Sequence, residues 1–266
     1  MADTTSPTTA IDLDGTVNTR DVGGIPLSDG AAVRPGVLLR SDNLQDLSAR
    51  DIATLVDGMG LRAVIDLRTE YELVSEGPGP LEADTRVRIE HRSLYPETGG
   101  GTDLDLATIV PWGDGQGADL PDETPTVRAY LGYLKRRPDS VVGALRTISE
   151  SDGATLVHCA AGKDRTGVVV AIALSVAGAD RDAIVADYLA TAENIEAIVA
   201  RLAASPTYTR EISADDPHVH APREGAMERV LELLDRDHGG VPDWLESHGF
   251  GPDEQAALRR RLRSDG

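Results

Sequence analysis

The chain has little of several residue types, and each shortage limits what the protein can be. Cys159 is the only cysteine in 266 residues, so no disulfide can form within the chain and nothing requires an oxidising compartment. Aromatic residues make up only 3% of the sequence, so a core must rely on Val, Leu, Ile and Ala. No apolar run reaches the length of a membrane-spanning helix, and we therefore expect no stable membrane insertion.

Basic residues are also scarce. The 26 Lys and Arg residues face 45 Asp and Glu residues, which gives a formal net charge of −19 at pH 7, and only Lys135 and Lys163 are lysines. Such a negative chain repels nucleic acid and anionic membranes, so we expect neither as a long-range partner. Residues 1–7 have neither the basic nor the apolar part of a signal peptide. We expect a cytoplasmic location and leave open export without a cleaved signal.

The most informative segment surrounds the cysteine. Residues 158–167 read His-Cys-Ala-Ala-Gly-Lys-Asp-Arg-Thr-Gly, between an apolar run at 154–157 that is typical of a buried strand and a second run at 168–174 that is typical of a packed helix. A strand, a tight glycine-containing loop and a helix start form a phosphate-binding arrangement, because loop amides and the helix dipole favour an anion. This setting favours a thiolate at Cys159, and Arg165 can bind two phosphoryl oxygens as a fork.

Cysteine, five residues, arginine and then Thr-Gly resembles the signature loop of the cysteine-dependent protein tyrosine phosphatase superfamily. The full string resembles the bacterial branch of tyrosine and lipid phosphatases. The resemblance runs from about Gly15 to the C-terminus. Four further segments carry it, namely Asn18 to Gly24, Arg34 to Ser41, Val64 to Arg68 followed by Glu70, and Asp180 to Leu189.

The resemblance implies a mechanism for the loop. Cys159 attacks phosphorus in line and forms a cysteinyl-phosphate, which water then hydrolyses. Arg165 and the loop amides bind the oxygens on which charge accumulates. Thr166 is expected to donate its hydroxyl to the Cys159 thiolate, and His158 to hold the shape of the loop. The amides expected to bind phosphate belong to Ala160, Ala161, Gly162, Lys163, Asp164 and Arg165.

The general acid that protonates the leaving oxygen stays open among three carboxylates. The string Pro-Trp-Gly-Asp at 111–114 is not the mobile Trp-Pro-Asp motif of the larger superfamily. Asp164 ranks first, because lipid-directed relatives with aspartate at this loop position use it as the acid. Glu97 ranks second, since this branch places a candidate acid after the same strand. Asp66 ranks third, and a bond to Arg165 or to a loop amide is its alternative role.

Lys163 bears on the substrate. Gly-Lys-x-Arg in such a loop resembles the phosphoinositide-directed members, in which the lysine adds charge for a second phosphate. A solvent-facing lysine at the crown of the loop is the equal alternative. The resemblance implies activity on phosphotyrosine proteins, with phosphoserine, phosphothreonine and phosphoinositides as further substrate classes. We expect no metal or other cofactor, since a single cysteine and scattered histidines offer no ligand spacing.

Two other functions compete with this interpretation. Residues 11–17 read Ile-Asp-Leu-Asp-Gly-Thr-Val, which resembles the opening of a metal-dependent phosphatase of the haloacid dehalogenase type, with Asp12 as nucleophile and Asp14 as its partner. That chemistry needs both aspartates at the end of a buried strand, which the polar residues 6–10 cannot form. The other alternative is a non-catalytic phosphate-binding module, which would not need a thiolate.

Strand and helix patterns alternate along the chain and predict an α/β fold, with a central, mostly parallel sheet flanked by helices and with helical additions towards the C-terminus. We expect residues 1–10 to be disordered and residues 11–266 to form a single phosphatase-like catalytic domain. Segments 97–124 and 205–225 are polar and weakly periodic, which predicts mobile loops or a lid. Predicted strands cover 36–40, 62–67, 86–94 and 154–157. Predicted helices cover 49–59, 127–137, 140–150, 180–203, 224–235, 242–248 and 253–263.

Overall fold

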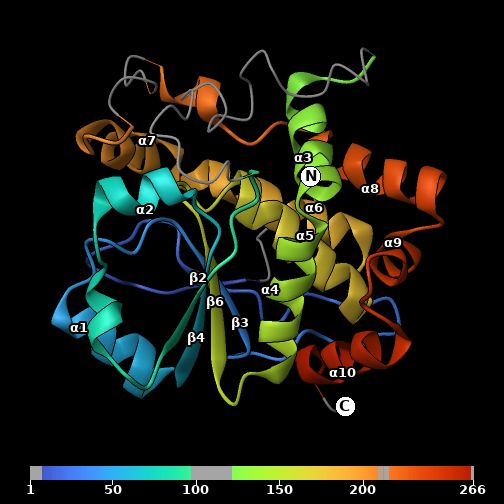
Figure 1. Cartoon of the computed structure of the whole chain (residues 1–266), viewed down its shortest axis with the longest axis horizontal. Coiled ribbons are helices and arrows are strands. Elements are labelled where there is room, and N and C mark those ends of the chain that lie inside the picture. The colour runs from blue at the N-terminus through green and yellow to red at the C-terminus, as the bar shows by residue number, and fades with distance from the viewer. Residues whose placement is uncertain (1–7, 97–121, 209–211, 213–215, 265–266) are drawn as a thin grey trace.

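The computed structural model of the chain describes residues 8–96, 122–208, 212 and 216–264. Its centre is a six-stranded sheet with the order β1-β2-β3-β6-β4-β5 (Figure 1). The four strands from β3 to β5 run parallel, whereas β1 and β2 pair antiparallel at one edge. The predicted α/β class with a mostly parallel sheet is confirmed. The strands are β1 (Thr9–Ala10), β2 (Arg20–Asp21), β3 (Leu38–Ser41), β4 (Leu61–Asp66), β5 (Arg88–His91) and β6 (Ala154–His158).

Strand β6 lies between β3 and β4, and all five of its residues are buried. Both of its faces meet apolar side chains. Leu156 joins a core cluster with residues that precede and follow α1, and Val157 joins the larger cluster on the opposite face. This double burial explains why 154–157 reads as a continuous apolar run rather than an alternating one.

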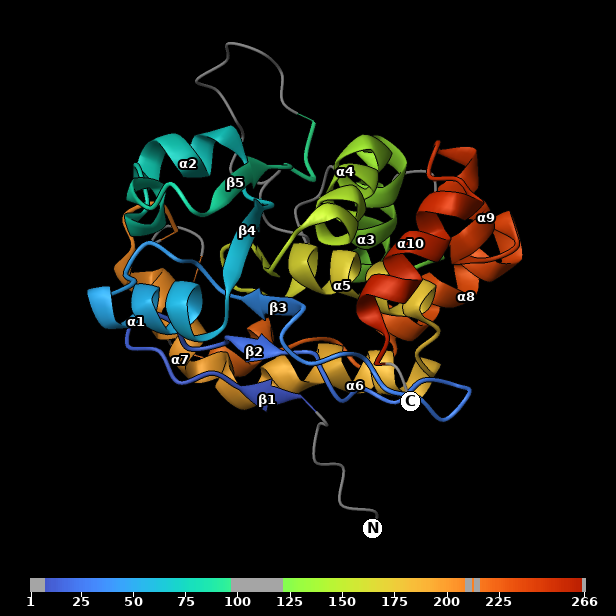
Figure 2. The same ribbon diagram turned by 90° about the horizontal axis from the view of Figure 1, so that it is seen from below.

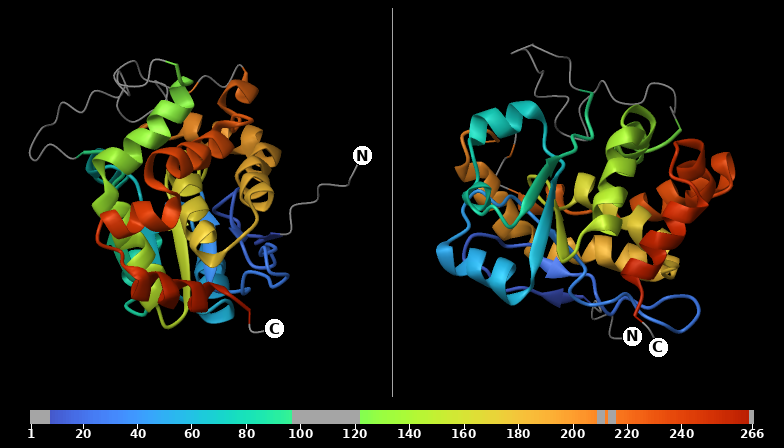
Figure 3. Two further views of the ribbon diagram at one scale, coloured as in Figure 1. Left: turned by 90° about the vertical axis from the view of Figure 1, so that its right-hand side faces the viewer. Right: turned by 60° about the horizontal axis from the view of Figure 1, so that its bottom comes forward.

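Helices cover both faces of the sheet (Figure 2). One face carries α1 (Ala49–Ala53) with the π-helical turn η1 (Thr54–Gly58). The C-terminal helices pack beside α3 and α4 on the other face (Figure 3). The helices on that face are α3 (Pro125–Arg136), α4 (Pro138–Glu150), α5 (Asp164–Ala177), α8 (Ala226–His238), α9 (Val241–Ser247) and α10 (Pro252–Leu262).

The remaining helices lie near the carboxyl end of the sheet. Thr69 caps α2 (Glu70–Glu76) by accepting a hydrogen bond from the Glu72 amide at 3.1 Å. After α5 the chain forms α6 (Arg181–Ala190), the 3₁₀ turn η4 (Thr191–Asn194) and α7 (Ile195–Ala204). A further 3₁₀ turn, η5 (Pro217–His220), follows, and η2 (Pro80–Ala83) precedes β5.

Several boundaries differ from those predicted. Thr9 and Ala10 form β1 instead of belonging to a disordered terminus, because their backbone pairs with Asp21 and Arg20. Both residues are exposed, so their side chains carry no burial pattern that the sequence could reveal. The single helix predicted over 180–203 is interrupted by η4, and residues 97–121 lie outside the described part of the chain. Within the described residues, no helix combines the length and the apolar character needed to cross a membrane.

Candidate active site

The signature loop joins β6 to α5 at the carboxyl edge of the sheet. The strand register places Ser41 of β3 and Asp66 of β4 on either side of His158, so the loop begins where three parallel strands end. Cys159 directly follows His158 and is buried. Gly162 has a φ of +65°, and a Cβ atom there would lie 2.4 Å from the Ser41 carbonyl oxygen. Only glycine therefore fits this close approach of the loop to β3.

Three consecutive loop carbonyls point at the surrounding protein. The carbonyl of Ala160 accepts from the amide of Asn43 at 3.0 Å, and that of Ala161 accepts from the Asn18 side chain at 3.0 Å. The Gly162 carbonyl accepts from Arg40 at 2.7 Å. Because the C=O and N–H of one trans peptide unit point in opposite directions, the amides that follow these carbonyls point into the loop. This arrangement is a nest for an anion.

Four buried side chains form a network that we call the loop clamp: Asn18 and Arg40 bond to the carbonyls of Ala161 and Gly162, and Arg20 and Asp187 hold these two side chains. Arg20 donates to Asp187 at 2.9 Å and to Asn18 at 2.8 Å, and Arg40 is ion-paired with Asp187. Burial alone would raise the pKa of Asp187, yet the two arginines hold it below its ordinary value. The clamp residues come from three of the segments that carry the family resemblance, which shows why those distant segments share one loop.

Arg165 lies in the first turn of α5 and is ion-paired with a carboxylate that the sequence analysis did not single out. Its Nη1 and Nη2 atoms donate to Glu72 at 2.6 and 2.9 Å. Glu72 is fully buried and also accepts from the Thr69 amide at 2.7 Å and from the Tyr208 hydroxyl at 2.8 Å. Burial would raise the pKa of Glu72, but Arg165 and these donors hold it below its ordinary value. Glu72 is therefore a carboxylate that fixes one edge of the Arg165 guanidinium.

Asp164 begins α5 and contacts a tyrosine. The Tyr130 hydroxyl donates to Asp164 Oδ1, and the Tyr188 hydroxyl lies 2.9 Å from that of Tyr130. The other carboxylate oxygen of Asp164, Oδ2, lies 3.5 Å from Lys163 Nζ. Lys163 is only 4% exposed and also donates to the His220 carbonyl, so the solvent-facing alternative for this lysine is wrong.

Asp66 does not bind Arg165 or a loop amide, contrary to the alternative role predicted for it. Its carboxylate accepts from the Arg68 guanidinium at 2.6 to 3.1 Å and lies 3.4 Å from His158 Nε2. Burial opposes ionisation of Asp66, but His158 and Arg68 depress its pKa far below the ordinary value. Asp66 is therefore ionised near neutral pH and has no proton to donate. Asp66 and His158 thus hold the ends of β4 and β6 together where the loop begins.

The other predicted residues fall into three situations. Thr166 Oγ1 is buried and makes no hydrogen bond with any described residue, so the predicted bond to Cys159 is absent in this structure. Glu97 lies outside the described residues. Asp12 and Asp14 have side chains that are 96% and 58% exposed and pair with Arg50, so they do not end a buried strand.

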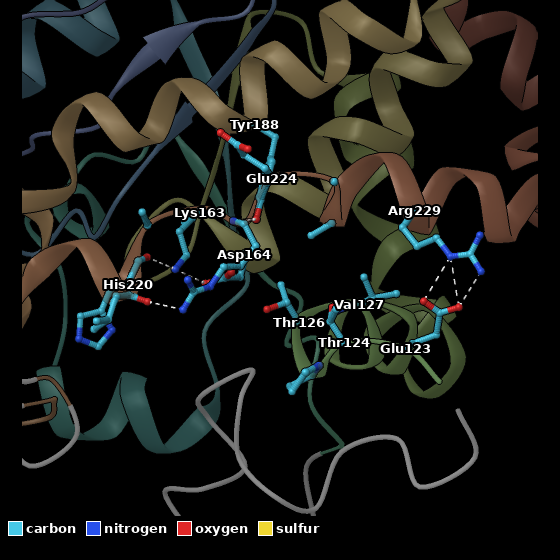
Figure 4. A pocket seen from close by; sticks show the side chains of 16 residues that line it. Glu123, Thr124, Thr126, Val127, Lys163, Asp164, Tyr188, His220, Glu224 and Arg229 are labelled. Atoms are coloured by element: carbon cyan, nitrogen blue, oxygen red, sulfur yellow. Dashed lines mark hydrogen bonds and ion pairs between the residues drawn. The ribbon is translucent and has the colours of Figure 1, made fainter. Parts of the chain in front are cut away.

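A cavity of about 770 Å³ opens beside the loop (Figure 4). Lys163 and Asp164 line it on the side of the loop, and Tyr188 of α6 lies next to them. At the opposite end, Arg229 of α8 forms an ion pair with Glu123 at 2.8 Å. The volume lies within the range of small-molecule binding sites. The loop therefore adjoins a space large enough for a small molecule, with Lys163 and Asp164 at the boundary between them.

A family model described as the tyrosine phosphatase family matches residues 11–264. The chain belongs to the tyrosine phosphatase family. The triple specificity protein phosphatase PtpB of Mycobacterium tuberculosis is 32% identical over 94% of this chain and 96% of its own length. A tyrosine-protein phosphatase of Nostoc commune is 28% identical over 91% of this chain and 79% of its own length. These matches, together with the exposed Asp12 and Asp14, leave the metal-dependent alternative without support.

The main site residues of this phosphatase that sequence reasoning missed are Glu72 and three tyrosines, Tyr130, Tyr188 and Tyr208. Five of the six tyrosines are buried, in a chain with only 3% aromatic residues. Of the other two, the Tyr95 ring lies beside the Arg165 guanidinium, whereas Tyr133 bonds to Tyr95. The scarcity of aromatic residues was the one sequence signal that could have drawn attention to these tyrosines. Glu72 stands three residues after Thr69, a spacing that reveals a helix cap but not an arginine partner. The five tyrosines are Tyr95, Tyr130, Tyr133, Tyr188 and Tyr208.

Proposed function

We propose that this tyrosine phosphatase uses Cys159 as its nucleophile, Arg165 and the loop amides as its phosphate ligands, and Asp164 as its general acid. The observation that carries the proposal is the set of outward-held carbonyls, which turns the amides after Cys159 inward. A planar phosphoryl group in the transition state places its charge where those amides converge.

The free edge of Arg165 supports its role. Glu72 occupies one N–H of Nη1 and one of Nη2, and the second Nη1 proton points towards the Leu67 carbonyl at 3.4 Å. The Nε proton and the remaining Nη2 proton form a parallel pair on the other edge. Such a pair matches two phosphoryl oxygens, which a lysine cannot do.

The reaction then proceeds in two steps. The thiolate of Cys159 attacks phosphorus, the bond between phosphorus and the ester oxygen breaks, and the leaving oxygen takes a proton from Asp164. In the second step, the Asp164 carboxylate removes a proton from water as the water oxygen attacks phosphorus. The bond between phosphorus and sulfur breaks, so phosphate leaves and the thiolate is restored.

Phosphotyrosine proteins are the first substrate class, and we propose phosphoserine, phosphothreonine and phosphoinositides as further classes. The buried position of Lys163 beside the cavity supports this breadth, because its charge lies next to the nest rather than in bulk solvent. A panel of phosphopeptides and phosphoinositide headgroups tests it. Turnover of phosphotyrosine peptides alone would restrict the enzyme to the first class.

The decisive experiment is hydrolysis of para-nitrophenyl phosphate by the wild-type protein and by Cys159→Ser, each measured with and without EDTA. We expect wild-type turnover that EDTA does not affect, and a loss of at least about 10⁴-fold in the variant. Arg165→Lys keeps the charge but removes the fork, so it should raise KM and lower kcat. Activity that survives Cys159→Ser but is lost to EDTA would overturn the proposal and return attention to Asp12 and Asp14.

A further inference from the structure

Asp164 stands at the end of a chain of hydrogen bonds that runs through two buried tyrosines. The amide of Arg223 donates to the Tyr188 hydroxyl at 3.1 Å, and the Tyr188 hydroxyl lies 2.9 Å from that of Tyr130. Tyr130 then donates to Asp164 Oδ1. Tyr130 comes from α3, Tyr188 from α6 and Arg223 from the segment before α8, so three separate parts of the fold meet in this chain.

The direction of every proton in the chain follows from its two ends. A backbone N–H can only donate, so the Tyr188 oxygen accepts from Arg223. An ionised carboxylate can only accept, so Tyr130 gives its single proton to Asp164. The remaining contact must then be a donation from Tyr188 to Tyr130. All donors point towards Asp164, and hydrogen bonds aligned in this way polarise one another.

Both phenols keep their protons under working conditions. Tyr130 is fully buried and Tyr188 is 1% exposed. Burial raises the pKa of each hydroxyl, and the nearby Asp164 carboxylate raises it further. Tyr130 therefore keeps the proton that it donates to Asp164 Oδ1.

We propose that Tyr130 is a positioning residue for the reaction, which directs the transferable proton of Asp164 to Oδ2 and stabilises the carboxylate left behind. Oδ1 is occupied by the Tyr130 donor, so the acid proton must reside on Oδ2, the oxygen that lies beside Lys163. Both Asp164 and Lys163 line the cavity next to the nest, whereas Tyr130 does not (Figure 4). Tyr188 orients the Tyr130 hydroxyl.

The proton count of the step is simple. The Asp164 Oδ2–H bond breaks as the leaving oxygen gains that proton, and the electron pair stays on the carboxylate. The tyrosine protons do not move. The bond from Tyr130 strengthens as negative charge forms on Asp164, since hydrogen bonds to ionised groups are stronger than those to neutral ones. The contact is thus worth more in the transition state than in the ground state, which is the condition for catalysis.

The inference rests on the proposed role of Asp164, and a leaving-group series tests it. Protonation matters most for a poor leaving group, so kcat/KM is compared for phenyl phosphate and para-nitrophenyl phosphate. We expect Tyr130→Phe to lower kcat/KM about tenfold for phenyl phosphate, as for a lost hydrogen bond to a charged group, and much less for para-nitrophenyl phosphate. A uniform loss for both substrates would overturn the inference.

Tyr133→Phe is the matched control. Tyr133 lies on the same helix, is 1% exposed and bonds to the Tyr95 hydroxyl at 3.1 Å instead of to Asp164. Tyr133→Phe also loses one buried tyrosine hydroxyl, and we expect it to show the same leaving-group dependence as the wild-type protein. An equal change in Tyr130→Phe and Tyr133→Phe would overturn the inference.

Asp164→Asn separates this inference from the proposed function. We expect the steepest leaving-group dependence in this variant and no further change in the double variant with Tyr130→Phe, because both act through one group. If the leaving-group dependence is steep in Asp164→Asn but unchanged in Tyr130→Phe, the positioning role alone is overturned. If it is unchanged in Asp164→Asn, the role of Asp164 as general acid is overturned as well. If Tyr130→Phe does not fold, Tyr188→Phe should shift the dependence in the same direction by a smaller amount, and no shift overturns the inference.

Discussion

The signature loop is supported differently on its two sides. On the side of the sheet, Asn18 and Arg40 of the loop clamp donate to the loop carbonyls, and Arg20 and Asp187 hold these two donors in place. On the side of the site, Asp164 is held by a phenol and Arg165 by one carboxylate. Hydrogen bonds from the clamp thus fix the shape of the loop, whereas Glu72 and a tyrosine hydroxyl orient the reactive side chains. Loop shape and chemistry therefore depend on separate contacts, and each can be perturbed without the other.

Helix α6 contributes to both sides. Asp187 belongs to the clamp, and the next residue, Tyr188, belongs to the chain that ends at Asp164. Adjacent residues of a helix point about 100° apart, so one helix can contact both sides of the loop. Substitutions outside α6 therefore separate the support of loop shape from the support of the reactive side chains most clearly.

Arg40→Met gives the largest expected effect on the clamp side. The change leaves one Asp187 oxygen without its buried donor and the Gly162 carbonyl with only the longer bond from Asn18 at 3.4 Å, which should lower the free energy of unfolding by about 3 kcal/mol or more. Urea denaturation measures it. Arg50→Met is the control, since Arg50 forms an exposed pair with Asp14 whose loss should cost at most about 1 kcal/mol. An equal loss of unfolding free energy in Arg40→Met and Arg50→Met would show that the clamp does not stabilise the fold.

Glu72→Gln tests the opposite side. The variant keeps the shape of the side chain but loses the fork to Arg165, and we expect kcat/KM to fall roughly 10²-fold, as when a preorganised transition-state contact is lost. Glu70→Gln, at an exposed position in the first turn of the same helix, should stay close to wild type. Steady-state kinetics with para-nitrophenyl phosphate gives the answer. A fall of less than threefold would mean that Arg165 does not need Glu72 to aim it.

Tyr208→Phe has the smallest expected effect and divides the site side into two parts. It removes one of the donors to Glu72, which is worth about 1 kcal/mol, or roughly fivefold in kcat/KM. The loss should be equal for phenyl and para-nitrophenyl phosphate, because Tyr208 supports Arg165 and not the acid. Tyr71→Phe, on the half-buried face of α2, is the matched control. A leaving-group dependence in Tyr208→Phe would contradict this division.

The sequence predicted the four parallel strands and the loop because their signals are local, whereas it missed the short strands β1 and β2. The run 154–157, the glycine at 162 and the spacing from Cys159 to Arg165 lie within the twelve residues 154–165, and short-range sterics decide their conformation. The predicted bond from Asp66 to Arg165 or to a loop amide was wrong for an equally local reason. Arg68, two residues along the chain, binds the Asp66 carboxylate instead.

The partners of the reactive residues were beyond local reasoning. Glu72 and Arg165 are 93 residues apart, and Tyr130 and Asp164 are 34 apart, so only the packing of helices on the sheet brings each pair together. Lys163 was ambiguous because its burial depends on η5, which supplies the His220 carbonyl from 57 residues away. The role of Glu97 stays a prediction.

The place of β6 between β3 and β4 has a consequence for how long the reactive centre persists. Opening β6 to solvent would require breaking ladders on both sides and exposing two apolar faces, so its amide hydrogens should exchange only when the whole domain unfolds. The base of the nest is then as durable as the fold itself. The turn η5 and the segment before α8 belong to neither ladder and contact the site through hydrogen bonds from Lys163 and to Tyr188. We therefore expect their amide hydrogens to exchange at a lower free energy of opening than those of β6.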